Sequence, residues 1–551
     1  MRVSQRFYVL LVIAVCTEAV VGQLRLASVF ADRMVLQRDE PVCIWGEAAA
    51  GRTVTVEFAG PGIEAVVAAD GRWRAVLPPL AASATGRELV VRCADEVLRV
   101  ADVLVGDVWL CGGQSNMEWK LRSSRDADVE IESADTPEIR FLRLPKIARS
   151  EPQRDFPVKN AKSNEGNWFA CVPEHAGNCT GVGYYFARRL HRRLQIPIGI
   201  IDTSWGGTMA QHWCTQETLR AIPAVEPYYE KYQARLDAWL ERGGEEGAQR
   251  QFEADLAAWE EAQRAAKAAG EREPRKPRES DYRNPAHEGH PGAMFHGLIS
   301  PLEGLALRGV LFYQGENNSF AEAWKPFPAT FPAIIRDWRR AFGKDDLPVG
   351  LIQIAGWSNR RSMTYDMNHH TNIVREVQFD TWRDTPNTGL IVTYDTNSNG
   401  SIHPGRKLPV GERAARWALA EVYGIKQGRS DRALEWRGPV FDKARVEGNK
   451  IIASFVEETA RGLRLDQDLE VGFYIAGEDR EFHVARARVV NKTEVAVWCD
   501  AVAEPVAVRY GWSNLPIGGL MNARELPAYP FRSDDWPMVP HQSQGAYTRS
   551  R

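Results

Sequence analysis

The sequence lacks a strong excess of charge of either sign and has few cysteines. Its 69 Lys and Arg residues are balanced by 72 Asp and Glu, a net charge of −3, and no basic stripe stands out, so we expect no nucleic-acid partner. Eight cysteines in 551 residues are too few for a disulfide scaffold. The hydrophobic fraction of 44% is too high for a disordered chain. These absences leave a globular protein of roughly three or four folding units.

Sequence signals for metals and redox chemistry are missing as well. The chain has no C-x-x-C pair, and its histidines do not show the H-E-x-x-H spacing of zinc enzymes. We therefore expect no metal and no organic cofactor. Cys171 and Cys179 are close enough in sequence for a local disulfide, which we state as a hypothesis.

The N-terminus has the order of a secretory signal. Arg2 and Arg6 precede an apolar run over 7–15, and Gly22 supplies a small residue at the expected cut. The run is short and is followed by Glu18, which argues against a membrane span. We expect residues 1–22 to be a signal peptide and the mature protein to be secreted or periplasmic.

The sequence pattern changes twice along the chain. Short alternating segments broken by Gly and Pro predict an N-terminal β-sandwich over 23–103, and a similar pattern predicts a C-terminal β domain over 437–551. Between them, at 104–436, uniformly apolar runs alternate with helical segments, which is typical of an open parallel sheet in an α/β domain. The runs are 105–110, 198–201, 310–313, 349–354 and 390–394. A segment rich in Ala, Glu and Arg predicts a helical insertion over about 215–285.

Polar residues with catalytic potential follow several of these runs. Ser115 lies on a Gly-flanked turn after the first run, the Gly206-Gly207 pair follows the second, and Gln314 follows the third. His403 comes after the last run, in the loop before a predicted helix. The carboxyl ends of parallel strands share one edge of a sheet. A serine, oxyanion donors and a histidine at that edge fit acyl transfer.

The order of the motifs resembles the sialate O-acetylesterase family, a branch of the SGNH hydrolases. The central motifs are G-Q-S-N-M, S-W-G-G-T, F-Y-Q-G-E-N-N and I-H-P-G-R-K, and flanking motifs extend the resemblance over nearly all of the mature chain. The resemblance implies an SGNH-hydrolase three-layer sandwich with an open parallel sheet, flanked by N- and C-terminal β domains. It also implies a serine carbohydrate esterase that removes O-acetyl groups from sugars.

The resemblance further implies roles for individual residues. Ser115 is the expected nucleophile and His403 the general base. The N–H groups of Ser115 and of Gly206 or Gly207, with the amide of Gln314, form the expected oxyanion hole. The reaction would pass through an acetyl-serine intermediate.

One position departs from the family pattern. The family has an aspartate two residues before the catalytic histidine, whereas this chain has Ser401. Aspartate supplies a negative charge to the imidazolium, and serine supplies only a neutral acceptor. Three alternatives remain at this stage. Another acid, Glu316 or Asp395, orients His403; a Ser–His dyad is held by a backbone carbonyl; or the activity is weak or lost.

The sequence leaves the substrate open. Asn116, Trp205 and Arg375 are candidate substrate-binding residues, with Arg375 a potential ligand for a sialic acid carboxylate, and Trp109 and Trp119 are candidates for a sugar cleft. The alternatives are an acetylxylan or other polysaccharide acetylesterase on the same scaffold and a catalytically weak carbohydrate-binding homologue. The oligomeric state is not readable from the sequence.

Overall fold

A computed structural model describes residues 22–158, 164–278, 282, 284–285, 289–357, 370–397, 401–428, 431–466 and 472–537. The predicted signal peptide, except for Gly22, lies outside these described residues. No helix in the described ranges is long and apolar enough to cross a membrane.

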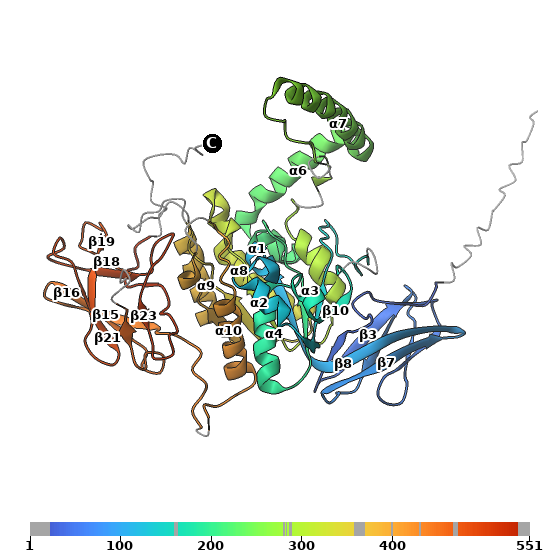
Figure 1. Ribbon diagram of the computed structural model, residues 1–551, viewed down its shortest axis with the longest axis horizontal. Helices are drawn as coiled ribbons and strands as arrows, with labels where there is room; N and C mark the ends of the chain where they lie inside the picture. Colours follow the sequence, from blue (N-terminus) through green and yellow to red (C-terminus); the bar gives the residue numbers. More distant parts are fainter. Residues whose placement is uncertain are drawn as a thin grey trace, which may run out of the picture.

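The centre of the molecule is a mostly parallel sheet (Figure 1). Its strand order is β10 (Trp168–Cys171), β9 (Thr136–Arg143), β11 (Ile198–Asp202), β8 (Glu96–Gly113), β12 (Gly309–Tyr313), β13 (Val349–Ile352) and β14 (Thr388–Ile391). Neighbours from β9 to β14 are parallel, and β10 pairs antiparallel with β9 at the edge. The apolar runs seen in the sequence lie in five of these strands, and the two strands β9 and β10 extend the sheet beyond them.

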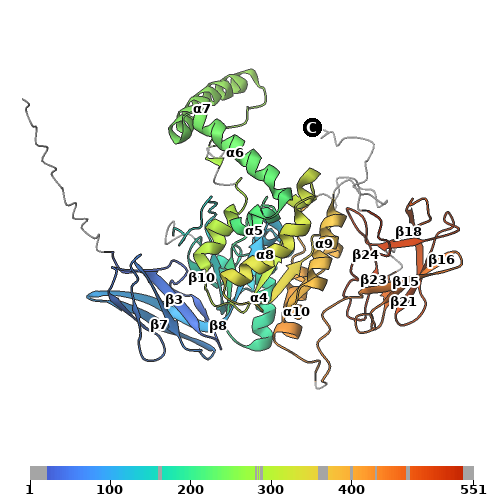
Figure 2. The same ribbon diagram turned by 180° about the vertical axis from the view of Figure 1, so that it is seen from behind.

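Helices pack on both faces of this sheet (Figures 1 and 2). Helix α4 (Gly181–Leu194) lies on the face of Cys111, because Gly183 approaches Cys111 and Ile200. Helix α8 (Phe327–Ala341) lies on the opposite face, where the indole of Trp338 covers the next residue of β8, Gly112. Helix α10 (Leu408–Trp417) packs beside α4, and α9 (Thr371–Asp384) beside α8. The shorter helices are α1 (Ser115–Glu118), α2 (Ala127–Glu132), α3 (Pro173–Ala176) and α5 (Gln216–Arg220).

The N-terminal β region is joined to the central sheet through one strand. Strand β8 pairs antiparallel with β7 (Ser83–Cys93) in its first half and parallel with β11 and β12 in its second. The predicted boundary between 103 and 104 therefore falls inside a continuous strand. The other strands here are β1 (Arg25–Leu26), β2 (Val35–Gln37), β3 (Val42–Glu47), β4 (Thr53–Glu57), β5 (Ile63–Val66) and β6 (Arg72–Leu77).

The C-terminal region is a set of small antiparallel sheets at the other end of the molecule (Figure 1). One contains β15 (Phe441–Glu447), β16 (Lys450–Phe455), β20 (Arg486–Val489) and β21 (Glu494–Trp498); another contains β18 (Phe473–Ala476), β19 (His483–Val484), β22 (Ala507–Tyr510) and β24 (Phe531–Arg532); β17 (Arg464–Leu465) pairs with β23 (Leu520–Met521). It contacts α9 through the stacked rings of Trp382 and Tyr529 and the ion pair between Arg532 and Glu376.

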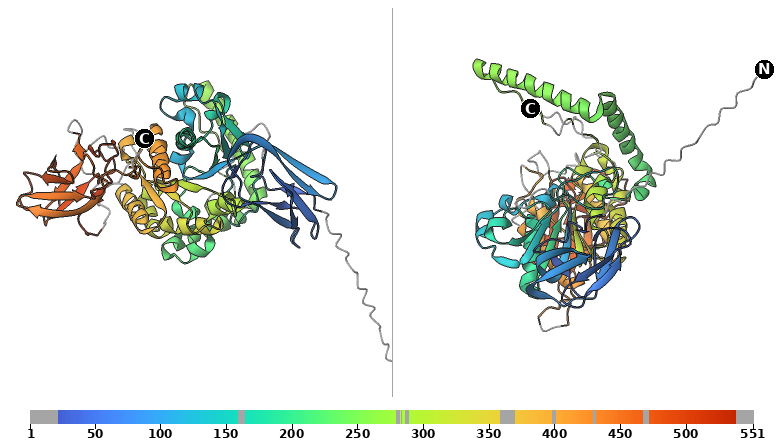
Figure 3. Two further views of the ribbon diagram at one scale, coloured as in Figure 1. Left: turned by 90° about the horizontal axis from the view of Figure 1, so that it is seen from below. Right: turned by 90° about the vertical axis from the view of Figure 1, so that its right-hand side faces the viewer.

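The segment predicted as a helical insertion contains two long helices, α6 (Glu226–Glu241) and α7 (Gly244–Ala269). They project from the body of the molecule (Figures 1 and 3). The division of the whole chain into three domains and an insertion stays a prediction.

The proposed disulfide between Cys171 and Cys179 is wrong for this structure. Both cysteines are free, as are Cys43, Cys93, Cys111, Cys214 and Cys499. The thiol of Cys179 instead donates to the carbonyl of Ala176. Burial raises the pKa of the Cys171 thiol to about 12, and a thiol that stays protonated is a poor nucleophile.

Candidate active site

The turn that presents Ser115 requires glycine. Gly113 ends β8 with φ of +118°, and a Cβ there would lie 2.1 Å from the carbonyl oxygen of Tyr313 in β12. The N–H of Gln114 donates to the same carbonyl at 2.9 Å. Only a residue without a side chain permits this approach, so the chain turns here and Ser115 begins α1.

Ser115 and His403 meet at the carboxyl edge of the sheet. Nε2 of His403 lies 2.7 Å from Oγ of Ser115. The imidazole stacks on Trp119, with ring centroids 5.5 Å apart and 23° between the planes. Burial and the charge of Lys407 lower the pKa of His403 below its ordinary value, partly offset by Glu118. The neutral imidazole can therefore accept the serine proton at neutral pH.

The three residues considered for orienting His403 do other things. Ser401 Oγ accepts the backbone N–H of His403 at 3.0 Å, which fixes the loop and leaves the ring untouched. Asp395 forms an ion pair with Arg413 at 2.6 Å. Glu316 accepts a hydrogen bond from Asn116 at 2.5 Å. Within the described ranges no carboxylate bonds to the ring of His403.

Beneath the nucleophile, Asn116 links two buried charged groups. Its amide nitrogen donates to Glu316 and also, at 3.0 Å, to the carbonyl of Ile402, while its amide oxygen accepts from Lys407 Nζ at 2.5 Å. Burial raises the pKa of Glu316 to about 7 and lowers that of Lys407 to about 7. Asn116 is fully buried, so the expectation that it binds substrate is wrong; it ties the nucleophile turn to the histidine loop.

The expected oxyanion donors differ in their availability. The amide of Gln314 donates to Gln114 Oε1 and to the carbonyl of Thr208, both at 2.9 Å. Both of its N–H groups are thereby used, which corrects the expectation that it faces the oxyanion. Gly206 lies against Ser115, because a Cβ on Gly206 would be 3.1 Å from that of Ser115. The N–H groups of Ser115 and Gly207 make no hydrogen bond within the described ranges.

The N–H of Gly206 already holds an anion. It donates to Glu118 Oε2 at 2.7 Å, while the other oxygen of Glu118 pairs with Lys146 at 2.6 Å and Arg143 at 3.1 Å. Lys146 Nζ also lies 5.7 Å from the ring centroid of Trp205, so Trp205 lies beside a cationic part of the site. Sequence reasoning missed Glu118, Arg143, Lys146 and Lys407, although Lys407 closes the I-H-P-G-R-K motif.

Arg375 lies outside this site, contrary to expectation. Its guanidinium donates to the side chain of Asn372 and the carbonyl of Ser513, and its side chain is fully buried. Burial lowers its pKa to about 9. Arg375 therefore links α9 to the C-terminal region. Trp109 is fully buried between Phe186 and Trp417, so it does not line a sugar cleft.

The described residues hold no group of three or more His, Cys, Asp and Glu side chains arranged for a metal ion. At the edge of the sheet the hydroxyl of Ser115 and the imidazole of His403 lie beside the backbone N–H groups of the Gly206 loop. Groups of these kinds can carry out acyl transfer.

Comparisons with known proteins place the chain among carbohydrate esterases. The profile of the family described as carbohydrate esterase, sialic acid-specific acetylesterase, matches residues 105–262 and 294–416. The chain belongs to this family, which confirms the resemblance and makes the protein an ester hydrolase. Ser115, His403 and the loops around them all lie within the matched ranges.

Full-length relatives agree with this assignment. The sialate O-acetylesterase of Mus musculus is 27% identical over 542 residues, covering 92% of this chain and 93% of the relative. That of Homo sapiens is 26% identical over 532 residues, covering 89% and 88%. A carbohydrate acetylesterase from Xanthomonas citri has a crystal structure with a TM-score of 0.73 and 31% identity, covering 93% of this chain and all of that one.

We expect Asn116→Ala to destabilise the protein, because it leaves the buried Glu316 and Lys407 without their shared partner. Each unpaired buried group costs roughly 1–3 kcal/mol. Urea unfolding should show a lower midpoint, and ester hydrolysis should fall because Asn116 also holds the carbonyl of Ile402.

The matched control is Asn178→Ala, which removes an amide that accepts an exposed hydrogen bond from the guanidinium of Arg122. Equal unfolding midpoints for the two variants would contradict a structural role for the buried network.

Proposed function

We propose that the protein is an SGNH-type serine esterase that removes O-acetyl groups from sugars through an acetyl-Ser115 intermediate. The observation that supports this most directly is the 2.7 Å contact between Nε2 of His403 and Oγ of Ser115. It places a general base in hydrogen-bond reach of a serine hydroxyl, in a chain of a carbohydrate esterase family.

The proposed reaction has two halves. Ser115 Oγ attacks the acetyl carbonyl while its proton moves to Nε2 of His403, and the tetrahedral intermediate then collapses. The bond between the acetyl carbon and the sugar oxygen breaks, and that oxygen takes the proton from His403. Water, deprotonated by His403, attacks the acetyl-serine; the serine recovers the proton and acetate leaves.

The oxyanion is held by backbone N–H groups in this proposal. The N–H of Ser115 is available, and the loop of Gly206 and Gly207 lies beside it. The carboxylate of Glu118 on the Gly206 N–H indicates that this donor faces a position that accepts anionic oxygen. Rotation of Glu118 toward Arg143 and Lys146 would release the donor for the reaction.

We propose that His403 works in a Ser–His dyad. Ring stacking on Trp119 and the backbone hydrogen bond to Ser401 hold the loop and the ring. A dyad lacks the negative charge that stabilises the imidazolium, so part of the rate available to a full triad is given up.

For the substrate we propose an O-acetylated sialic acid or a closely related acidic sugar. The relatives from mouse and human are named sialate O-acetylesterases, and Arg143 and Lys146 place two cations beside the site. The side chain of Lys146 is 36% exposed, so it can bind a sugar carboxylate while Glu118 stays paired with both cations. Secretion or export to the periplasm, proposed from residues 1–22, is compatible with such a substrate.

Ser115→Ala should lower kcat/KM by about 10⁴-fold or more, because it removes the group that forms the acyl bond. Acetate release from p-nitrophenyl acetate and from O-acetylated sialic acid measures the effect. The control is Ser133→Ala, at the exposed residue that directly follows α2. Undiminished hydrolysis by the pure Ser115→Ala protein would exclude Ser115 as nucleophile.

The same assay separates the substrate classes. We expect acetate from O-acetylated sialic acid and much less from acetylated xylo-oligosaccharides. The reverse order would favour the polysaccharide acetylesterase alternative and leave the serine mechanism intact.

Ser401→Asp should raise kcat/KM at neutral pH by about tenfold or more, since it returns a carboxylate to the position that orients the histidine in triads. The carboxylate also favours the imidazolium and raises the pKa of His403. Activity that depends on neutral His403 falls below that pKa, so the acid limb of the pH profile should move to higher pH.

Ser401→Asn is the control, because it has the shape of aspartate without the charge. If Ser401→Asp and Ser401→Asn give the same rate and the same pH profile, the missing carboxylate does not limit catalysis.

A further inference from the structure

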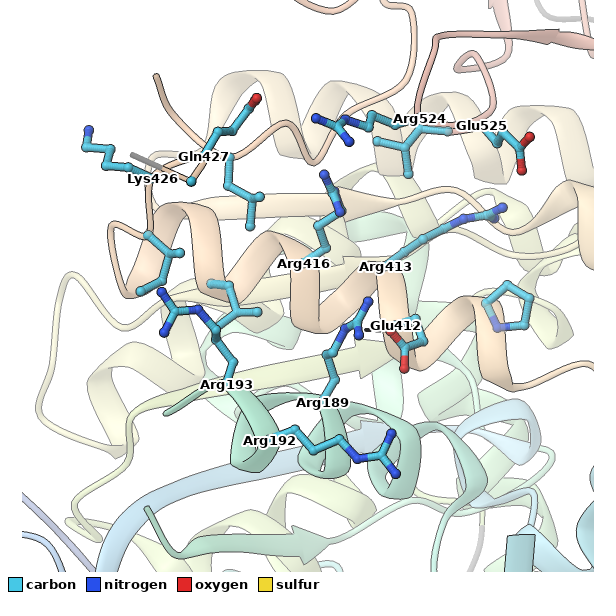
Figure 4. Close-up of a pocket in the computed structure, with 16 residues that line it drawn as sticks. Arg189, Arg192, Arg193, Glu412, Arg413, Arg416, Lys426, Gln427, Arg524 and Glu525 are labelled. Atoms are coloured by element: carbon cyan, nitrogen blue, oxygen red, sulfur yellow. Dashed lines mark ion pairs between the residues drawn. The ribbon is translucent and has the colours of Figure 1, made fainter. Parts of the chain in front are cut away.

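A second concave region lies away from the nucleophile, between α4, α10 and two loops (Figure 4). Its volume is about 800 Å³. One loop contains Lys426 and Gln427, and the other, from the C-terminal region, contains Arg524 and Glu525. We call this region the arginine cavity. It is large enough for an organic ligand of several rings, since small-molecule sites commonly span 300–1,000 Å³.

The arginine cavity is strongly cationic although the whole chain has a net charge of −3. Seven cationic side chains and two carboxylates line it. The cations come from α4, α10 and both loops: Arg189, Arg192, Arg193, Arg413, Arg416, Lys426 and Arg524. Their convergence from four separate segments concentrates positive potential in one cavity.

Part of this charge is paired. Arg189 binds Glu412 at 2.7 Å (Figure 4), Arg413 binds Asp395, and Arg524 binds Glu435 at 3.3 Å. Four cations, Arg192, Arg193, Arg416 and Lys426, form no ion pair within the described ranges. These four side chains are therefore able to pair with an anionic ligand.

Arg416 is the most constrained of the four. Its Nε donates to the carbonyl of Glu435, which fixes the guanidinium in the lining of the cavity, where the side chain extends toward that of Arg524 (Figure 4). Burial and the nearby charges of Arg524 and Arg189 lower its pKa, with Glu435 acting in the opposite sense. The cations therefore repel one another, and a bound anion relieves that repulsion.

The helix dipole accounts for the positions of only some of these cations. Arg192 and Arg193 lie in the last turn of α4 and Arg416 in that of α10, where the helix dipole favours cations. Lys426 and Arg524 lie on loops outside both helices, and the dipole gives no reason for their convergence on the same cavity.

The apolar part of the lining narrows the ligand class. Leu419, Ile425 and Leu526 contribute apolar surface between the cationic side chains. A small inorganic anion makes no use of such surface. A sugar ring has an apolar face and can carry carboxylate or sulfate groups, so an acidic saccharide matches both parts of the lining.

We propose that the arginine cavity is a second, non-catalytic binding site for an acidic oligosaccharide, whose carboxylate or sulfate groups pair with the unpaired cations Arg192, Arg193, Arg416 and Lys426. Arg416 is nine residues along the chain from the active-site Lys407, or about 14 Å along a helix. Lys407 directly precedes α10 and Arg416 lies in its last turn, so the arginine cavity can hold an acidic glycan while Ser115 acts elsewhere. The site does not depend on the proposed acetyl-serine chemistry.

Calorimetric titration of the full chain with oligogalacturonate, with a sulfated oligosaccharide and with a neutral xylo-oligosaccharide of similar length tests the proposal. Wild type should bind one or both acidic ligands and not the neutral one, and binding should weaken with added salt. The triple variant Arg192→Gln/Arg193→Gln/Lys426→Gln should lose about tenfold or more in affinity. Hydrolysis of p-nitrophenyl acetate should stay unchanged.

The matched control is Arg264→Gln/Arg272→Gln/Arg278→Gln, which removes three exposed cations from the helical insertion and changes the net charge equally. No binding of either acidic ligand by wild type, or equal losses in the two triple variants, would overturn the proposal. Equally tight binding of inorganic sulfate, or of a single-stranded oligonucleotide, would also overturn the assignment to a saccharide.

Discussion

The active site depends on the parallel pairing of β8 with its two neighbours. Cys111 of β8 is level with Asp202 at the end of β11, and Gly113 is level with Tyr313 at the end of β12. Three loops therefore begin at the same height, those of Ser115, Gly206 and Gln314. A one-residue slip would turn the side chains of β8 to the wrong faces and separate the serine from its donors.

The same alignment of strands requires glycine at position 113, where a side chain would collide with Tyr313. The carbonyl of Gly113 accepts the N–H of Trp205 at 2.8 Å, and Tyr313 accepts the N–H of Gln114, so the turns after β8, β11 and β12 are bonded to one another. Gln114 and Gln314 extend this by bonding side chain to side chain. These contacts hold the nucleophile turn in place. Gln314 uses its amide to make them and so holds the loops together.

The charges around Ser115 and His403 are arranged differently from those of a Ser–His–Asp triad. No acid of the described ranges touches the histidine ring, while Glu316 and Lys407 are buried one layer below and bridged by Asn116. Burial and, after it, the charge of Lys407 lower the pKa of His403, which keeps the base neutral and makes the imidazolium more costly to form. The neutral imidazole of His403 is therefore available to accept a proton, while its imidazolium form is less stabilised than in a triad.

The sequence was sufficient for the main strands, the family and the Ser115–His403 pair, because buried parallel strands are uniformly apolar and glycines mark the turns between strand and loop. It was insufficient for roles that depend on side-chain direction. Arginine commonly binds carboxylates, but Arg375 points into the contact between α9 and the C-terminal region. Asn116 follows Ser115 in the sequence, but its side chain points inward to Lys407. Strands β9 and β10 were missed, since β9 mixes Glu138 and Arg140 with its apolar residues.

The central claim is that acetyl is transferred to Ser115. Mixing the protein with p-nitrophenyl acetate, quenching in acid within the first turnover and mapping the peptides by mass spectrometry tests it directly. The account predicts one acetyl group on the peptide that contains Ser115, formed and lost at rates compatible with turnover. Acetate release without any acetylation of that peptide, or acetylation only at another residue, would contradict it.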